Sequence, residues 1–148
     1  MPHTRKIEIG LKMREAKLLN GMIFSTEAWT SISDTELTRM EQVDLALLRS
    51  LVEGHSKCSK AFILMEFGVL KMCYRIMIRR MMYHQHIITR DSKELIHKIY
   101  LKQKEDSLRG DWYKTLQEDF QFIGEDLDDG KIRKMPKIEY RKYIKMKV

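Results

Sequence analysis

Hydrophobic residues recur at every third or fourth position along most of the chain, which is the spacing of one buried helix face. No pair of alternating apolar runs is joined by a hairpin turn, so the pattern does not favour strands. The spacing predicts helices over about residues 6–22, 33–53, 60–67, 70–89, 91–109 and 112–123, with a last helix near Pro136. The sequence therefore predicts an all-α fold, an irregular bundle of six to seven helices with a basic C-terminal helix or tail.

Several helix boundaries carry residues that satisfy the free backbone groups at helix ends. Ser33 and Glu36 have the spacing of a capping box, and Asp91 and Glu94 form a second start signal. Pro136 suits the first turn of the last helix. Helix ends are predicted at Asn20-Gly21, where both residues tolerate a left-handed backbone, and at Gly54, Gly68, Gly110 and Gly124.

The apolar stripes identify the residues expected to hold the bundle together. The expected core set is Leu37, Met40, Leu47, Leu48, Leu51, Ile76 and Tyr83, with Val43 on the same stripe as the leucines. In later helices the residues expected to face inward are Leu95, Ile96, Ile99, Tyr100, Trp112, Leu116, Phe120 and Ile123. We also expect Trp29 to be a packed anchor.

Composition narrows the class of protein. The chain has 148 residues and a formal net charge of +7. Its longest apolar run, residues 61–65, is far shorter than the roughly 20 residues of a membrane span. Cys58 and Cys73 are too few for a disulfide framework, which favours a reducing compartment. We expect an intracellular protein, nuclear or cytoplasmic, with no secretory segment, no membrane partner and no cofactor.

Charge divides the chain into blocks. Residues 1–104 carry a net charge of +7, residues 105–130 a net charge of −7 and residues 131–148 a net charge of +7. Such blocks can steer a polyanion, and they can also attract one another. We expect residues 1–124 to form one helical domain and residues 125–148 to form an acidic loop followed by a basic tail.

The long helix after Gly68 is the most informative segment. It places a basic ridge on one side, made of Lys71, Arg75, Arg79 and Arg90. Regularly spaced cations suit phosphate contacts, because they displace condensed counterions. The alternative is a solvated face whose charges meet carboxylates of other helices. Arg80 points away from the ridge, and we expect it to form an internal ion pair or to cover apolar surface with its stem.

The C-terminal tail is a second basic element. Its expected phosphate contacts are Lys134, Lys137, Arg141 and Lys142. Tyr140 and Tyr143 lie between these cations and are suited to stacking on bases. The alternative is a solvated tail that folds back on the acidic loop.

The sequence predicts neither a catalytic residue nor a metal site. The one acidic pair that resembles a two-metal site, Asp128-Asp129, has no flanking strands, and Asp128 is better suited to capping a helix. His55 and Cys58 have a suggestive spacing, but there is no Cys-x-x-Cys. His84 and His86 on one helix diverge by about 200°.

Short motifs along the chain stand in the order found in one family. They are Asn20-Gly21-Met22, Glu27-x-Trp29, Glu41-x-Val43-Asp44, Leu47-Leu48-Arg49, Leu64-Met65-Glu66-Phe67-Gly68, Arg79-Arg80-x-x-Tyr83, Ile87-Ile88 and Gly110-Asp111-Trp112. In these motifs the chain resembles the region downstream of the polymerase palm in non-LTR retrotransposon reverse transcriptases, the endonuclease–reverse transcriptase family. The resemblance covers about residues 10–145.

The resemblance implies a thumb and linker region that grips the template–primer duplex. It also implies that the polymerase aspartates lie upstream, on a palm that is absent here, so this chain is expected to be a fragment without enzyme activity of its own. The expected partner is nucleic acid, either RNA, DNA or a hybrid, bound through its backbone. The alternatives are a protein-interaction bundle, which docks on the palm or self-associates, and a non-functional translated relic.

Overall fold

The computed structural model describes residues 3–30, 32–52, 58–106, 108 and 111–148. Of these residues, 76% are helical and none lies in a strand, which confirms the predicted all-α class. Within the same ranges no helix is both long and apolar enough to cross a membrane.

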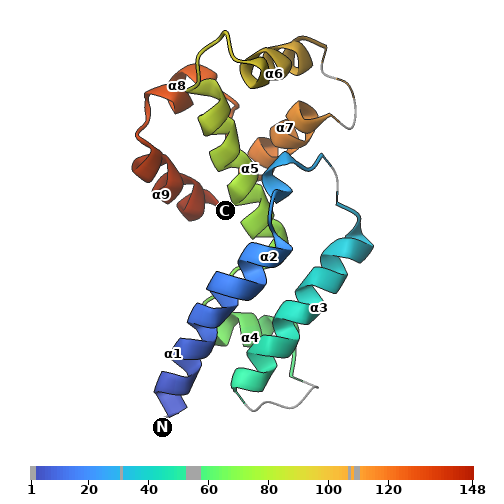
Figure 1. Ribbon diagram of the computed structural model, residues 1–148, viewed down its shortest axis with the longest axis vertical. Coiled ribbons are helices and arrows are strands. Elements are labelled where there is room, and N and C mark those ends of the chain that lie inside the picture. Colours follow the sequence, from blue (N-terminus) through green and yellow to red (C-terminus); the bar gives the residue numbers. More distant parts are fainter. Residues whose placement is uncertain (1–2, 31, 53–57, 107, 109–110) are drawn as a thin grey trace. The chain divides into compact units, whose positions relative to one another are not determined.

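The chain divides into two compact units (Figure 1). The N-terminal unit consists of Met1–Phe24 and Ile32–Arg75, and the C-terminal unit consists of Ser25–Ser31 and Ile76–Val148. This division differs from the predicted boundary after residue 124. The predicted acidic loop and basic tail belong to the same unit as the helices before them.

The N-terminal unit is built from helical segments on either side of residues 25–31. They are α1 (His3–Met13), the π-helical η1 (Arg14–Leu19), α2 (Asn20–Met22), α3 (Asp34–Leu51), α4 (Lys60–Glu66) and the first turn of α5 (Met72–Ile88). Leu45, Leu48, Ile63 and Leu64 form its core between α3 and α4. Ser33 and Glu36 form the predicted capping box at the start of α3.

A buried ion pair decides which face of α3 is inside. Arg14 on η1 donates from Nη2 to Asp44 Oδ2 over 2.6 Å, and both side chains are buried. Asp44 therefore turns inward together with Leu45, whereas Val43 is left 51% exposed. The prediction that Val43 lies on the buried stripe is wrong, because apolar spacing alone gave no sign of a paired carboxylate in the core.

The C-terminal unit continues α5 and adds four further helices. After η2 (Thr26–Ala28) and α5 come α6 (Leu95–Asp106), α7 (Trp112–Phe122), α8 (Asp129–Lys134) and α9 (Lys137–Lys147). Its core includes Met81, Ile88, Leu116, Phe120, Ile132 and Ile144. The last two of these residues show that the predicted basic tail is helical and contributes to the core.

Two expectations about packing in this unit are wrong. Leu95 is 74% exposed and Ile99 is 49% exposed, although both were expected to face inward. Tyr100 is buried as predicted, and the unpredicted His97 is buried beside it, because their polar groups find partners inside the unit. Trp29 is 40% exposed and is not a packed anchor.

The predicted glycine stops have mixed outcomes. Gly68 and Gly124 adopt a positive φ of 59° and 71° after α4 and α7, as expected of left-handed helix ends. The Asn20-Gly21 pair remains helical, and the left-handed residue after it is Ser25, with φ 58°. Gly54 and Gly110 lie outside the described residues.

The two helical glycines of the N-terminal unit give a matched test of packing. A Cβ atom on Gly10 would lie 2.9 Å from Leu51 Cδ1, whereas a Cβ atom on Gly21 would meet nothing within 4 Å. We expect Gly21→Ala to raise the free energy of unfolding by about 0.5–1 kcal/mol, because alanine is the better helix former. Gly10→Ala should lower it by about 1–2 kcal/mol, because Leu51 must shift. Urea denaturation followed by circular dichroism measures both, and equal stabilisation by the two variants would contradict this packing.

Candidate nucleic-acid interface

A basic groove lies in the C-terminal unit, with a cavity of about 480 Å³. Helix α5 supplies Ile78, Arg79, Met82, Tyr83 and His86 to its lining, α9 supplies Lys137, Arg141 and Lys145, and Glu27 completes it. The α9 cations are four residues apart and therefore share one helix face. Arg79, Met82, Tyr83 and His86 share a face of α5 for the same reason.

The charge of the basic groove is mostly uncompensated. Arg79 donates from Nε to Glu27 over 3.2 Å, and its Nη groups have no acceptor among the described residues. Within the same part of the chain no carboxylate pairs with Lys137, Arg141 or Lys145. The groove thus brings together one residue of the predicted ridge and two of the predicted tail contacts, and it adds Lys145.

The rest of the predicted ridge behaves differently. Arg75, in the N-terminal unit, donates from Nη2 to Glu15 Oε1 over 2.9 Å. Arg90 follows α5 and donates from Nη1 to Glu94 over 3.1 Å, and its Nε hydrogen bonds to His86. Lys71 is exposed. For Arg75 and Arg90 the structure agrees with the alternative that ridge charges meet carboxylates.

Of the predicted tail contacts, Lys137 and Arg141 line the groove and the other two do not. Lys134 and Lys142 are exposed but do not line the groove. Tyr140 is only 1% exposed, so the expectation that it stacks on bases is wrong. Tyr143 lies under Lys131 and Lys147, and its hydrogen bond to Glu125 raises the pKa of its hydroxyl to about 12.

The histidines and cysteines do not assemble a metal site in the described residues. His84 is fully buried and His86 is exposed, as expected from their divergence on one helix. Both cysteines are partly buried and unpaired. His55 lies outside the described residues.

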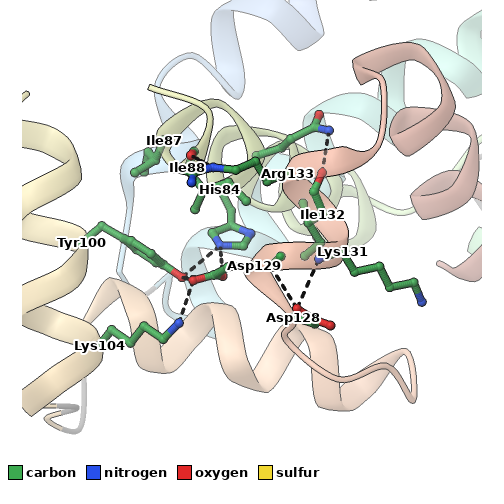
Figure 2. A network of polar contacts seen from close by, with 12 residues as sticks. His84, Ile87, Ile88, Tyr100, Lys104, Asp128, Asp129, Lys131, Ile132 and Arg133 are labelled. Carbon is green, nitrogen blue, oxygen red and sulfur yellow. Dashed lines mark hydrogen bonds and ion pairs between the residues drawn. The ribbon is translucent and has the colours of Figure 1, made fainter. Parts of the chain in front are cut away.

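The predicted role of Asp128 is confirmed, but sequence reasoning missed that of Asp129. Asp128 caps α8 by accepting hydrogen bonds from the amides of Gly130 and Lys131. Asp129 points the other way, into a network of donors from two other helices (Figure 2). A carboxylate at a helix start is compatible with both roles, so the sequence offered no signal to separate them.

The Asp129 network joins α5, α6 and α8. Its Oδ1 lies 3.1 Å from His84 Nε2 and accepts from the Tyr100 hydroxyl over 2.8 Å. Its Oδ2 accepts from Lys104 Nζ over 2.7 Å. Figure 2 shows the three donors converging on the one carboxylate from α5 and α6.

The network changes the acidity of its members. Burial raises the pKa of Asp129, but hydrogen bonds from His84, Lys104 and Tyr100 outweigh it and hold that pKa well below its usual range. Burial and the bond to Asp129 raise the pKa of Tyr100. The hydrogen bond to Asp129 likewise raises the pKa of Lys104. At neutral pH the carboxylate is therefore ionised.

Two further hydrogen bonds hold the α8 segment against α5 and so position the groove. Gln85 on α5 donates to the carbonyl of Met135 over 2.8 Å, and Arg133 Nε donates to the carbonyl of Ile88 over 2.8 Å. Only Met135 and Pro136 separate α8 from α9. Fixing α8 against α5 therefore also fixes where α9 starts, and with it the cations that face Arg79.

A buried ion pair lies beside the groove residue Arg79. Arg80 donates from Nη1 to Asp119 on α7 over 2.5 Å, and both side chains are buried. This confirms the expectation that Arg80 forms an internal ion pair. Burial raises the pKa of Asp119 to about 6, although Arg80 opposes the shift.

No protein-family model, curated protein or solved structure matches the chain. What the chain does must therefore be inferred from its residues and their geometry.

Substitutions of the neighbouring residues Asp128 and Asp129 test the Asp129 network. We expect Asp129→Ala to lower the free energy of unfolding by about 2–3 kcal/mol, because buried His84 and Tyr100 lose their charged partner. Asp128→Ala removes only a helix cap and should cost about 1 kcal/mol. Because the folded pKa of Asp129 lies below its unfolded value of about 3.9, its contribution is present above that pH and lost below it. The difference in the free energy of unfolding between the parent and Asp129→Asn, measured by urea denaturation, should therefore become smaller below pH 4. A difference that becomes larger there contradicts the network.

Breaking the ion pair between Arg80 and Asp119 should change the stability of the protein in a pH-dependent way. Arg80→Ala should lower the free energy of unfolding at pH 8 by about 3 kcal/mol, because Asp119 is left buried and charged. Without the arginine the folded pKa of Asp119 rises above 6, so protonation relieves the cost as the pH falls. The loss in the free energy of unfolding of Arg80→Ala relative to the parent should be smaller at pH 5 than at pH 8, as measured by urea titrations. A deficit independent of pH would show that lost packing dominates.

Proposed function

We propose that the chain is a non-catalytic helical module that binds nucleic acid through its phosphate backbone in the basic groove. The observation that supports this proposal is the convergence of Arg79, Lys137, Arg141 and Lys145 around one cavity. The sequence resemblance points to the same class, the post-palm region of a non-LTR retrotransposon reverse transcriptase. On this proposal the chain is a fragment of such an enzyme, and any polymerase chemistry belongs to a palm outside it.

The groove suits a polyanion for electrostatic reasons. Three of its cations have no carboxylate partner among the described residues, and Arg79 retains two free Nη donors, which match phosphate oxygens in geometry. Phosphate contacts release condensed counterions, so binding should be strong at low salt and should weaken steeply as salt rises. Contacts of this kind position a strand without reading its sequence.

The other predicted contacts have lesser roles in this proposal. Lys71, Lys134 and Lys142 are exposed and add non-specific attraction. Arg75 and Arg90 contribute little, because their Nη groups, unlike those of Arg79, already bond to Glu15, Glu94 and His86.

A protein-interaction role has its own supporting observation. Helix α4 exposes Phe62 and Met65, at 57% and 81%, which suits docking on a palm or on a second copy. Salt dependence separates the two functions, because an apolar contact does not weaken as salt rises.

Paired arginine variants test the nucleic-acid proposal. We expect Arg79→Ala with Arg141→Ala to reduce the slope of log K against log salt by between one and two units, because each phosphate contact contributes about 0.7–0.9. Fluorescence anisotropy with a labelled oligonucleotide, between 50 and 200 mM salt, measures the slope.

The matched control is Arg75→Ala with Arg90→Ala. It removes the same formal charge, but from arginines whose Nη groups already bond to Glu15, Glu94 and His86, so its slope should stay close to that of the parent. In the groove variant, Arg79 bonds to Glu27 through Nε alone and Arg141 pairs with no carboxylate among the described residues. If this control flattens the slope more than the groove variant does, the groove is not the binding site. If the parent binds no nucleic acid even at 50 mM salt, the proposed function is wrong.

A further inference from the structure

A second hollow, of about 120 Å³, adjoins the basic groove. Its apolar and aromatic lining includes Ala28, Tyr83, Ile96, Ile99 and Trp112, with Gln103 as a polar member. Tyr83 also lines the basic groove, so one aromatic residue borders both spaces. We call this second space the aromatic hollow.

The aromatic walls are held in place before any ligand binds. Trp112 is buried, and its Nε1 donates to the carbonyl of Glu27 over 2.7 Å. The ring of Tyr83 meets that of Trp112 edge to face, with centroids 5.9 Å apart and an interplanar angle of 89°. A ligand therefore meets a rigid surface and does not have to order it.

The hollow also offers a directed polar group. Gln103 accepts a hydrogen bond at Oε1 from the amide of Tyr113 over 3.3 Å, which holds its carboxamide. The Nε2 group of Gln103 has no acceptor among the described residues. It is thus a donor at the rim of an otherwise apolar space, suited to a carbonyl oxygen or ring nitrogen.

The two spaces together match one nucleotide better than a single apolar ligand. A nucleobase has a flat apolar face and hydrogen-bonding edges, and it is attached to a phosphate that needs cations nearby. Glu27 accepts a hydrogen bond from one residue of each space. Its carboxylate orients Arg79 of the basic groove, and its backbone carbonyl orients Trp112 of the aromatic hollow. A single apolar side chain of a protein partner would use the apolar walls but would leave the cations unpaired.

We propose that the aromatic hollow receives one unstacked base of a single strand whose phosphates lie in the basic groove. This inference rests on the proposed function and adds the substrate class, because a base paired and stacked within a duplex cannot enter the hollow. The chain then prefers single-stranded to fully paired nucleic acid of equal length.

The test compares two labelled single strands of equal length and charge, and a duplex of the same length, by fluorescence anisotropy at 50 mM salt. An oligothymidine strand should bind about tenfold tighter than the same strand made of abasic sites, because base stacking contributes that much per base. It should also bind tighter than a fully paired duplex. In a Trp29→Phe background Trp112 is the remaining tryptophan, and its fluorescence should be quenched by the intact strand and not by the abasic one.

Ile99 and Leu95 provide matched variants on α6. Both are exposed, but only Ile99 lines the hollow. Ile99→Ala should weaken binding of the intact strand by about threefold through lost apolar contact, and Leu95→Ala should not. Neither variant should change binding of the abasic strand.

The outcomes separate this inference from the proposed function. If intact, abasic and duplex ligands bind equally and with a steep salt dependence, the groove binds phosphates and the hollow proposal is overturned. Equal effects of Ile99→Ala and Leu95→Ala also overturn it. If no ligand binds at 50 mM salt, both proposals fail.

Discussion

The carboxylate of Asp129 is the contact on which the arrangement of the C-terminal unit depends. It accepts hydrogen bonds from His84 on α5 and from Tyr100 and Lys104 on α6, so a single residue of α8 joins three helices. Because only two residues separate α8 from α9, this joint also decides where the α9 cations lie. The basic groove is thus a consequence of a partly buried polar network as well as of apolar packing.

The charged residues divide into structural and available groups. Arg14 with Asp44 and Arg80 with Asp119 are buried pairs, and each is the kind of contact that orients a helix because an unpaired buried charge is costly. Lys137, Arg141 and Lys145 have no such partners in the described chain and stand on one face of α9. A net charge of +7 is therefore less informative than the separation of paired from unpaired cations.

The sequence predicted helix caps and helix ends reliably, because these features depend on residues close together in the chain. The capping box at Ser33 and Glu36, the cap at Asp128 and the left-handed Gly68 and Gly124 all depend on residues within one or two turns. Which face of a helix is buried was less predictable. Val43, Leu95 and Ile99 fit apolar stripes yet are exposed, while the polar residues Asp44 and His97 are buried because they find partners elsewhere in the chain.

The candidate site shows the same limit. The sequence by itself determined the helical class, most helix boundaries and the presence of two basic segments, since these follow from spacing, capping and composition. Only the tertiary structure decided that Arg79 joins Lys137 and Arg141, that Arg75 and Arg90 are neutralised, and that Tyr140 is buried. The physical reason is that ion pairs and groove walls form between residues far apart in the chain, and their partners carry no mark in the local pattern.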